Sequence, residues 1–360
     1  MGYDPGTGKQ RQKSITGKTQ KEVAQKLRQV TTEVDSGTYL EPSRLTVGQW
    51  LDIWKDTYLG GIKPRTVEIY QDDIAHHIAP HLGAIRLEEL NGFTIQQFYN
   101  GLVRSGLSPK TVRNIHGVLH SALRQAVRNQ LLRFNPADNC VLPKIEKTDL
   151  NPLDEEDIVR FLTVIRGNPY EDIFIVTLFT GMREGEVLGL TWDCIDFDHA
   201  TITVNKQLRR LRRAAGSFVL ASTKNGKTRT IAVGETILAQ LRKRKRQQAS
   251  WQLRAGSAWN NPDQLVFTNE LGRYLIHSTV YQAFKRAAVQ IGRGDARFHD
   301  LRHSYAVAAI RAGDDIKTVQ ENLGHATAAF TLDVYGHVTP QMKKASAERM
   351  EQFIRSVSGQ

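Results

Sequence analysis

The stretch RFHDLRHSYA, residues 297–306, carries two histidines four residues apart, His299 and His303, with an acidic residue directly after the first. This spacing is close to H-E-x-x-H, in which two histidines on a helix bind zinc and a glutamate serves as the base. Arg302 lies inside the motif, however, and a second cation is unfavourable beside a zinc ion. His299 and Arg302 are three residues apart, so a helix presents them to one point. Such a pair suits a phosphate, because arginine offers a planar fork of donors.

A second arginine follows a predicted helix end in FTGMREGEVLGL. Arg183 lies at the start of the next helix, where free backbone donors favour an anion. Glu186 shares its helix face and is placed to orient it, although a surface ion pair that contributes almost nothing is the alternative. In STKNGKTRT, Lys224 lies beside a tight turn that can present its ammonium group as a proton donor. An ordinary charged turn is the alternative there.

The last piece is ENLGHATAAFTLDVYGHV. Gly324 ends a predicted helix just before His325, and Tyr335 follows ten residues later. One tyrosine among ten is by default a core side chain. In chain order the sequence therefore offers R-x-x-E, a lysine beside a turn, H-x-x-R, L-G-H and a tyrosine. The combination indicates a phosphate-binding centre more strongly than any single motif does.

The composition favours a polyanionic partner. The 360 residues carry a formal net charge of +12 with a pI near 9.7, which points to nucleic acid, with an anionic membrane surface as the competing partner. No apolar run approaches the roughly 20 residues that span a bilayer, and the start shows no secretory signal pattern. Cys140 and Cys194 lack a CxxC partner, as free thiols of a reducing compartment do. We expect a DNA- or RNA-facing cytosolic protein.

Three regions are expected before the catalytic motifs. Residues 1–36 form a basic segment, with a strand that carries Lys9, Arg11 and Lys13 on one face, then a helix opened by a capping box. A disordered basic tail is the alternative. Residues 43–136 indicate a four-helix module with cations on its outside. Residues 137–152, rich in proline and asparagine, are the predicted linker.

Residues 153–360 indicate a larger mixed domain that holds every candidate site residue. Two helices precede a short strand region, and five further helices follow it. The last two strands flank Asn225-Gly226, a pair typical of a type I′ hairpin. The basic run 242–246 is expected to be a solvated helix face. The final helix is expected at 340–357.

These motifs, in this order, resemble the tyrosine recombinase (phage-type integrase) family, including integrases of integrative conjugative elements, conjugative transposons and temperate phages. The resemblance implies a multidomain fold. Residues 43–136 would be an all-α core-binding domain, and 153–360 a mainly α catalytic domain with a small antiparallel β-sheet. Residues 1–36 resemble the end of an arm-type DNA-binding domain, a partial α+β segment whose opening strands we expect to be absent.

The resemblance also implies how the phosphate is bound. Arg183 and Arg302 would be the two phosphate-binding arginines, and His325 would donate a hydrogen bond to the phosphate. Glu186 would support the site. No metal and no cofactor are implied, which separates this chemistry from the zinc hydrolase that the spacing of His299 and His303 suggests.

By the same resemblance, Tyr335 is the nucleophile, although its distance from His325 is one residue longer than is usual in the family. Lys224 protonates the leaving 5′ oxygen, with Lys227 as the alternative. His299 helps the nucleophile lose its proton. His303 is expected to be structural.

The function implied is site-specific DNA recombination through a 3′-phosphotyrosyl intermediate, to integrate or excise a mobile element. The partners would be double-stranded DNA attachment sites, with a homotetramer on DNA in which the helix at 340–357 docks onto a neighbouring protomer. Accessory directionality or DNA-bending proteins are further candidate partners, and no membrane is implied. The expected location is the bacterial cytoplasm, at the nucleoid. A type IB topoisomerase that relaxes DNA and a non-catalytic DNA-binding regulator are the competing functions.

Overall fold

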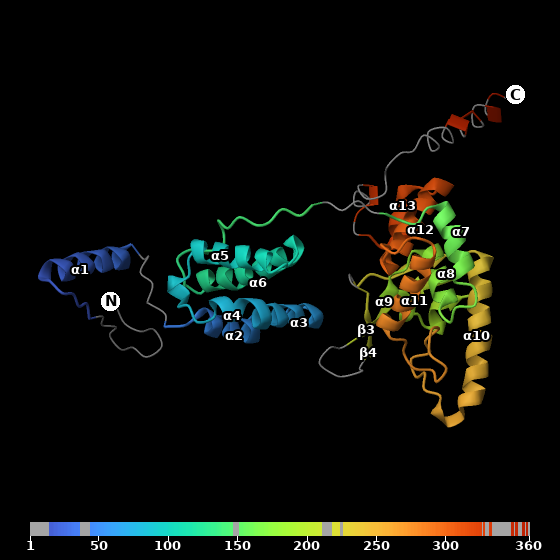
Figure 1. The fold of residues 1–360 in the computed structure, drawn as a ribbon, viewed down its shortest axis with the longest axis horizontal. Helices are drawn as coiled ribbons and strands as arrows, with labels where there is room; N and C mark the ends of the chain where they lie inside the picture. Colours follow the sequence, from blue (N-terminus) through green and yellow to red (C-terminus); the bar gives the residue numbers. More distant parts are fainter. Residues whose placement is uncertain are drawn as a thin grey trace. The chain divides into compact units, whose positions relative to one another are not determined.

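The chain divides into two compact units, Met1–Lys147 and Thr148–Gln360. In the computed structural model, the described residues are 14–36, 44–146, 151–210, 218–223, 226–325, 327, 331–332, 347–348, 350–351, 355–356 and 358. Figure 1 shows the elements of each unit along the chain. Within these ranges, we find no helix with the length and apolar character that crossing a bilayer requires.

The N-terminal helix, α1 (Gln20–Asp35), begins where the capping box predicts it. The Thr19 hydroxyl accepts a hydrogen bond from the Glu22 backbone N–H at 3.2 Å, which satisfies one of the free donors of the first turn. The predicted strand over residues 9–13 lies outside the described residues.

The next region contains the four predicted helical segments. They are α2 (Val47–Thr57), α3 (Pro64–Asp73) continued by a π-helical turn (Ile74–Ile78) and α4 (Ala79–Leu82), α5 (Gly92–Arg104), and α6 (Pro109–Arg128), with a 3₁₀ turn at Leu87–Glu89. Trp50, Leu51 and Trp54 form the predicted apolar stripe of α2 and are buried. Ser108 caps α6, accepting from the Thr111 N–H at 3.1 Å. Burial of these helix faces builds one core.

The predicted linker is fastened at both ends. The Gln96 side chain on α5 exchanges two hydrogen bonds with the Val141 backbone, of 2.8 and 3.0 Å, and Arg113 on α6 donates to the Pro143 carbonyl at 2.8 Å. In the second unit, Arg293 donates to the Asn151 carbonyl at 2.7 Å. The segment left between these anchors is therefore shorter than the composition of 137–152 suggests.

The second unit is mainly helical. Its helices are α7 (Glu155–Val164), α8 (Glu171–Thr180), α9 (Glu184–Leu188), α10 (Glu235–Ala255), α11 (His277–Gln290), α12 (Phe298–Ala312) and α13 (Ile316–Leu323), with 3₁₀ turns at Trp192–Cys194 and Gly256–Ala258. Its strands are β1 (Ile195–Asp196), β2 (Thr201–Val204), β3 (Lys206–Arg210), β4 (Phe218–Ser222) and β5 (Arg229–Ala232). The predicted C-terminal helix at 340–357 lies mostly outside the described residues.

The strand pairing corrects one prediction. β4 pairs with β3 and β5 pairs with β2, both antiparallel, so the two strands that flank Asn225-Gly226 belong to different sheets. Asn205 alone separates β2 from β3, and this nearly continuous strand supplies a partner to each. The predicted β4–β5 hairpin is therefore wrong, because an Asn-Gly pair favours a turn but does not choose the strands that pair across it.

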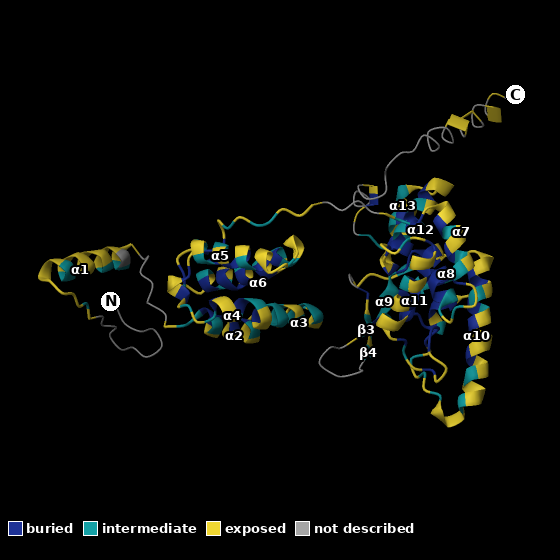
Figure 2. Cartoon of the chain, in the orientation of Figure 1, coloured by how far each residue is buried: buried dark blue, intermediate teal, exposed yellow. Residues whose placement is uncertain are grey.

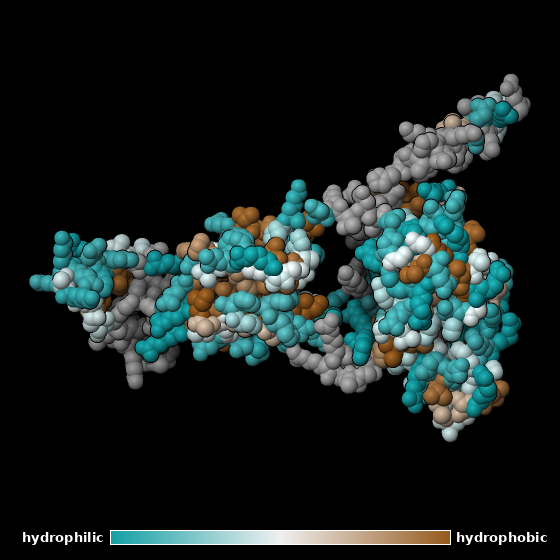
Figure 3. Space-filling model, in the orientation of Figure 1, coloured by the Kyte–Doolittle hydropathy of each residue, from teal (hydrophilic) through white to brown (hydrophobic). Residues whose placement is uncertain are grey.

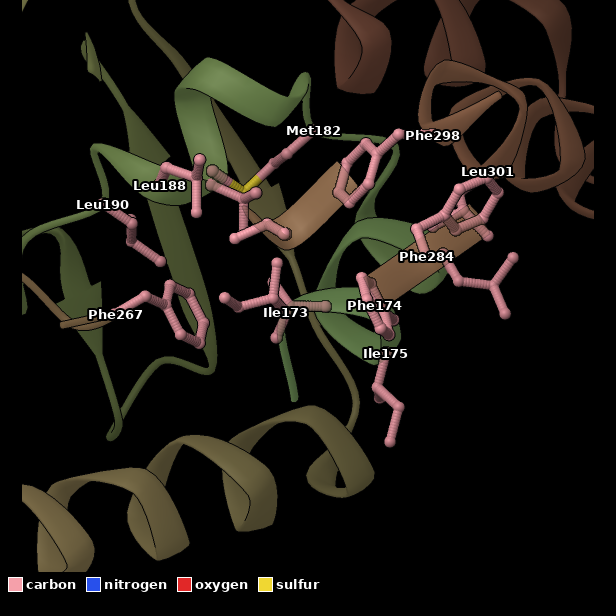
Figure 4. Close-up of a cluster of buried hydrophobic side chains, with 14 of the residues drawn as sticks. Ile173, Phe174, Ile175, Met182, Leu188, Leu190, Phe267, Phe284, Phe298 and Leu301 are labelled. Atoms are coloured by element: carbon pink, nitrogen blue, oxygen red, sulfur yellow. The ribbon is translucent and has the colours of Figure 1, made fainter. Parts of the chain in front are cut away.

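Helix α8 is the centre of the second core. All of its residues except Glu171 and Phe179 are buried, and the Phe174 ring lies 5.9–6.1 Å from those of Phe161, Phe284 and Phe298. Figure 4 shows Phe174, Phe284 and Phe298 gathered with neighbouring aliphatic side chains, and Figure 2 shows the buried interior of α8 and α12. Hydrophilic side chains cover most of the face in Figure 3. The contact between Phe174 on α8 and Phe298 on α12 fixes the two helices beside each other.

Candidate active site

The turn after α8 positions Arg183. Gly181 ends the helix in the left-handed conformation at φ 64°, and a Cβ there would lie 2.5 Å from the Tyr305 ring. Arg183 is then the N-cap of α9. Its Nη1 lies 2.8 Å from Glu186 Oε1, and its backbone N–H donates to Glu186 Oε2 at 3.0 Å. The Glu186 side chain is 1% exposed and that of Arg183 29%, so the surface-pair alternative is wrong.

Arg302 is buried between the ends of two other helices. It lies on α12 and is 1% exposed. Its Nη1 donates to the Gly181 carbonyl at 2.6 Å, and its Nη2 donates to the Leu323 carbonyl at the end of α13. The guanidinium therefore ties the turn before Arg183 to the turn before His325.

His325 follows α13 through a second left-handed glycine. Gly324, at φ 63°, ends the helix, and the His325 backbone N–H donates to the Gln320 carbonyl at 3.1 Å. The His325 ring Nδ1 lies 2.9 Å from the Thr331 hydroxyl. This hydrogen bond orients the His325 ring beside the site.

Both histidines of the site have strongly lowered pKa values. Although His299 keeps an exposed edge, desolvation of its ring lowers its pKa to about 4, and the charges of His303, Arg302 and Arg183 act in the same direction. Burial, followed by Arg302 and Arg183, lowers the pKa of His325 to about 4 as well. Because the same two arginines act on both rings, the structure brings these predicted site residues into one electrostatic cluster. Both imidazoles are neutral near pH 7.

His303 packs edge-on against His299, with ring centroids 4.8 Å apart. Within the described ranges, no group of three or more His, Cys, Asp or Glu side chains is placed to hold a metal ion. The spacing of the two histidines gives a ring contact in this structure.

A cavity of about 640 Å³ opens beside the cluster. Its described lining residues are Arg183, Thr223, Lys227, Thr228, Arg229, Thr230, Gln320, Glu321, Gly324 and His325. The Thr223 hydroxyl donates to the Lys227 carbonyl at 2.8 Å, which holds the turn that carries Lys227. Lys224 and Tyr335 lie outside the described residues, so the choice between the two lysines stays open.

Arg229 is the site residue that sequence reasoning missed. It lies on β5, is 10% exposed, and binds Glu186 through Nη2–Oε2 at 2.6 Å and Nη1–Oε1 at 3.2 Å. Although burial alone would raise it, the pKa of Glu186 is held at about 2 by Arg229 and then by Arg183. The period-two pattern gives a signal: Ile231 is buried, so Arg229, two residues earlier, points to the same face.

The chain resembles known recombinases along both units. Residues 151–342 match the phage integrase family, and residues 46–103 match the phage integrase N-terminal SAM-like domain. A tyrosine recombinase XerC-like protein of Caldanaerobacter subterraneus subsp. tengcongensis is 28% identical, over 96% of this chain and 93% of that protein.

Two solved structures share the fold. The Tn1549 transposon integrase in complex with transposon right end DNA superposes with a TM-score of 0.72 at 21% identity, covering 85% of this chain and 100% of that one. A lambda integrase tetramer bound to a Holliday junction gives a TM-score of 0.61 at 20% identity, covering 94% and 93%. The predicted fold class is confirmed.

The match over residues 151–342 and the similarity along nearly the whole chain to a XerC-like recombinase, together with a helical unit followed by a mainly α unit with small antiparallel sheets, identify a tyrosine recombinase. The chain belongs to the phage integrase family.

Proposed function

We propose that this recombinase cuts and rejoins DNA strands at specific sites through a 3′-phosphotyrosyl intermediate, and so integrates or excises a mobile element. One observation supports this most: Arg183, His299, Arg302 and His325 come from three separate helix ends and act on one another electrostatically. A phosphodiester needs such an array, because its pentacovalent transition state gains negative charge on oxygens that fixed cations stabilise.

In the proposed cleavage step, the Tyr335 oxygen attacks the phosphorus. A phosphorus–tyrosine oxygen bond forms as the bond to the 5′ oxygen breaks, and the strand ends in a free 5′ hydroxyl. The neutral ring of His299 accepts the tyrosine proton, because a pKa of about 4 leaves it unprotonated near pH 7. The leaving 5′ oxygen takes a proton from Lys224 or Lys227. Rejoining is the reverse attack by a new 5′ hydroxyl.

Arg183 and Arg302 differ in how they support this step. Arg183 faces the cavity with 29% of its side chain exposed, so it is available to phosphate oxygens. Arg302 donates through two nitrogens to the backbone carbonyls of Gly181 and Leu323. It therefore places the turns before Arg183 and His325 and adds its positive charge to the array proposed to bind the phosphate.

The proposed partners are double-stranded DNA attachment sites and further copies of this chain. The Tn1549 integrase is seen with transposon DNA and lambda integrase as a tetramer on a Holliday junction, and the charge of +12 suits DNA. We propose a tetramer on DNA in the bacterial cytoplasm, with the segment 340–357 docking onto a neighbouring protomer. Accessory directionality or DNA-bending proteins would act on the same assembly.

The test is formation of a covalent adduct. A duplex selected by this protein from a randomised pool is nicked beside the cleavage position, incubated with the chain, and separated by denaturing electrophoresis. A protease-sensitive protein–DNA adduct is expected. If no adduct forms, the competing function of a non-catalytic DNA-binding regulator is favoured. Supercoil relaxation without strand exchange between two duplexes would indicate a type IB topoisomerase.

A further inference from the structure

The side chain of Arg229 joins two helices beside the proposed site, α9 and α13. It lies on β5, just after the turn with Lys227, and its fork binds both oxygens of Glu186 on α9. Its Nε donates to the Asn322 carbonyl, in the last turn of α13, at 2.7 Å. The final carbonyls of a helix have no partner within it, so this hydrogen bond caps α13 where the chain turns toward His325.

The turn after α13 packs against the Arg229 side chain. A Cβ on Gly324 would lie 3.2 Å from Arg229 Cδ and 3.3 Å from its Nη1. Arg302 binds the neighbouring carbonyl, that of Leu323. Two arginines from different elements therefore hold successive carbonyls and fix the direction in which His325 leaves the helix.

The charges of this group decide how strongly Arg183 attracts an anion. Among the described residues, Glu186 is the one carboxylate that pairs with both Arg183 and Arg229, with distances of 2.8 Å to the first and 2.6 Å to the second. Two cations share one anion, so the triad keeps one positive charge, and its more exposed member is Arg183. Without Arg229, Glu186 would neutralise Arg183 and be free to turn toward the cavity, where it would repel a phosphate.

We propose that Arg229 is a positioning residue of the strand-cleavage reaction: it shares Glu186 so that Arg183 keeps its positive charge, and it caps α13 so that His325 meets the same phosphate. This role rests on the proposed function. It requires a guanidinium, because an ammonium group cannot bind both Glu186 oxygens and the Asn322 carbonyl in this fixed geometry.

The test compares two buried arginines of the catalytic unit. Arg229→Lys and Arg229→Met are compared with Arg244→Lys and Arg244→Met. Arg244 on α10 is also a buried arginine, and it pairs with a carboxylate, that of Asp172. Each variant is assayed for thermal unfolding, for DNA affinity, and for the first-order rate of adduct formation on nicked DNA at saturating protein. The saturated rate reports the bound, folded enzyme and is insensitive to a loss of stability.

Arg229→Met is expected to lower the saturated rate on the order of 100-fold, as misplaced catalytic groups do, and Arg229→Lys about 10-fold, with DNA affinity within a few-fold of the unmodified chain. The Arg244 variants are expected to unfold at lower temperature with an unchanged saturated rate. If Arg229→Met does not fold, Arg229→Lys decides: a saturated rate within twofold of the unmodified chain overturns the role.

A double variant tests the effect of the Glu186 charge on Arg183 separately. Adding Glu186→Gln to Arg229→Met removes the anion that neutralises Arg183, so the double variant is expected to cleave several-fold faster than Arg229→Met alone. A purely structural arginine predicts the opposite order, and a slower double variant overturns the role. An absence of adduct from the unmodified chain overturns the proposed function itself, and this role with it. Normal cleavage by Arg229→Lys overturns this role alone.

Discussion

Glu186→Gln should remove a large share of the stability of the catalytic unit. The Glu186 side chain is 1% exposed and lies between two arginines, and these hold its pKa at about 2 against an ordinary value of 4.5. At about 1.36 kcal/mol per pH unit, this difference corresponds to roughly 3 kcal/mol of stability near neutral pH. Loss of one partner from a buried ion pair costs a similar amount, about 3–5 kcal/mol.

The stabilisation that Glu186 contributes should depend on pH. The unfolded chain takes up a proton near pH 4.5, whereas folded Glu186 resists protonation until about pH 2. The contribution is therefore complete above pH 4.5 and is lost as the pH falls through about 2. Glutamine resembles the protonated acid, so the difference between the two proteins should be constant above pH 5 and shrink below pH 4.5.

Urea unfolding of the catalytic unit, followed by circular dichroism at several pH values, measures this difference. A loss of about 3 kcal/mol lowers Tm by roughly 6–12 °C in a unit of this size. Glu321→Gln is the matched control: Glu321 lines the cavity beside the site, but its ion pair with Lys317 is exposed and contributes about 0.5 kcal/mol or less. If both variants lose the same stability, the buried triad does not have the energetic role described here.

Three further outcomes follow from the site. Gly181→Ala places a methyl group 2.5 Å from the Tyr305 ring and should cost about 1–3 kcal/mol more than Gly313→Ala, which has only left-handed backbone strain; equal unfolding free energies would contradict the packing. NMR titration of free protein should find His299 and His325 changing charge near pH 4, and midpoints near 6.5 would refute the clustered cations. DNA affinity should fall steeply between low and moderate salt; a flat response argues against multiple phosphate contacts.

Local patterns were sufficient for the helices and for two short-range pairs of the candidate site. Thr19 and Ser108 cap the helices that their spacing predicts, because a cap depends on residues three positions apart. The i,i+3 pairs Arg183–Glu186 and His299–Arg302 likewise lie within one turn. Periodicity also predicted the apolar stripe of α2 that contains Trp50.

Contacts distant in sequence were not predictable in this way. The partner of Arg229 is 43 positions away in the chain, so no short motif joins them. β4 pairs with β3 and β5 pairs with β2, two strands that Asn205 alone separates. The Asn225-Gly226 pair carries no information about this choice of partners. Glu186 pairs with Arg229 of β5, and its helix α9 packs against α8 and β3. These contacts join separate parts of the chain, so the sequence alone left the surface-pair alternative open.

The most direct test of the central claim is to locate the covalent DNA on the polypeptide. The adduct is digested with nuclease and trypsin and the peptides are sequenced by mass spectrometry. A nucleotide is expected on the tryptic peptide 318–343, at Tyr335, and none after Tyr335→Phe. A nucleotide on 303–311, which carries Tyr305, or an adduct that persists in Tyr335→Phe, would contradict it.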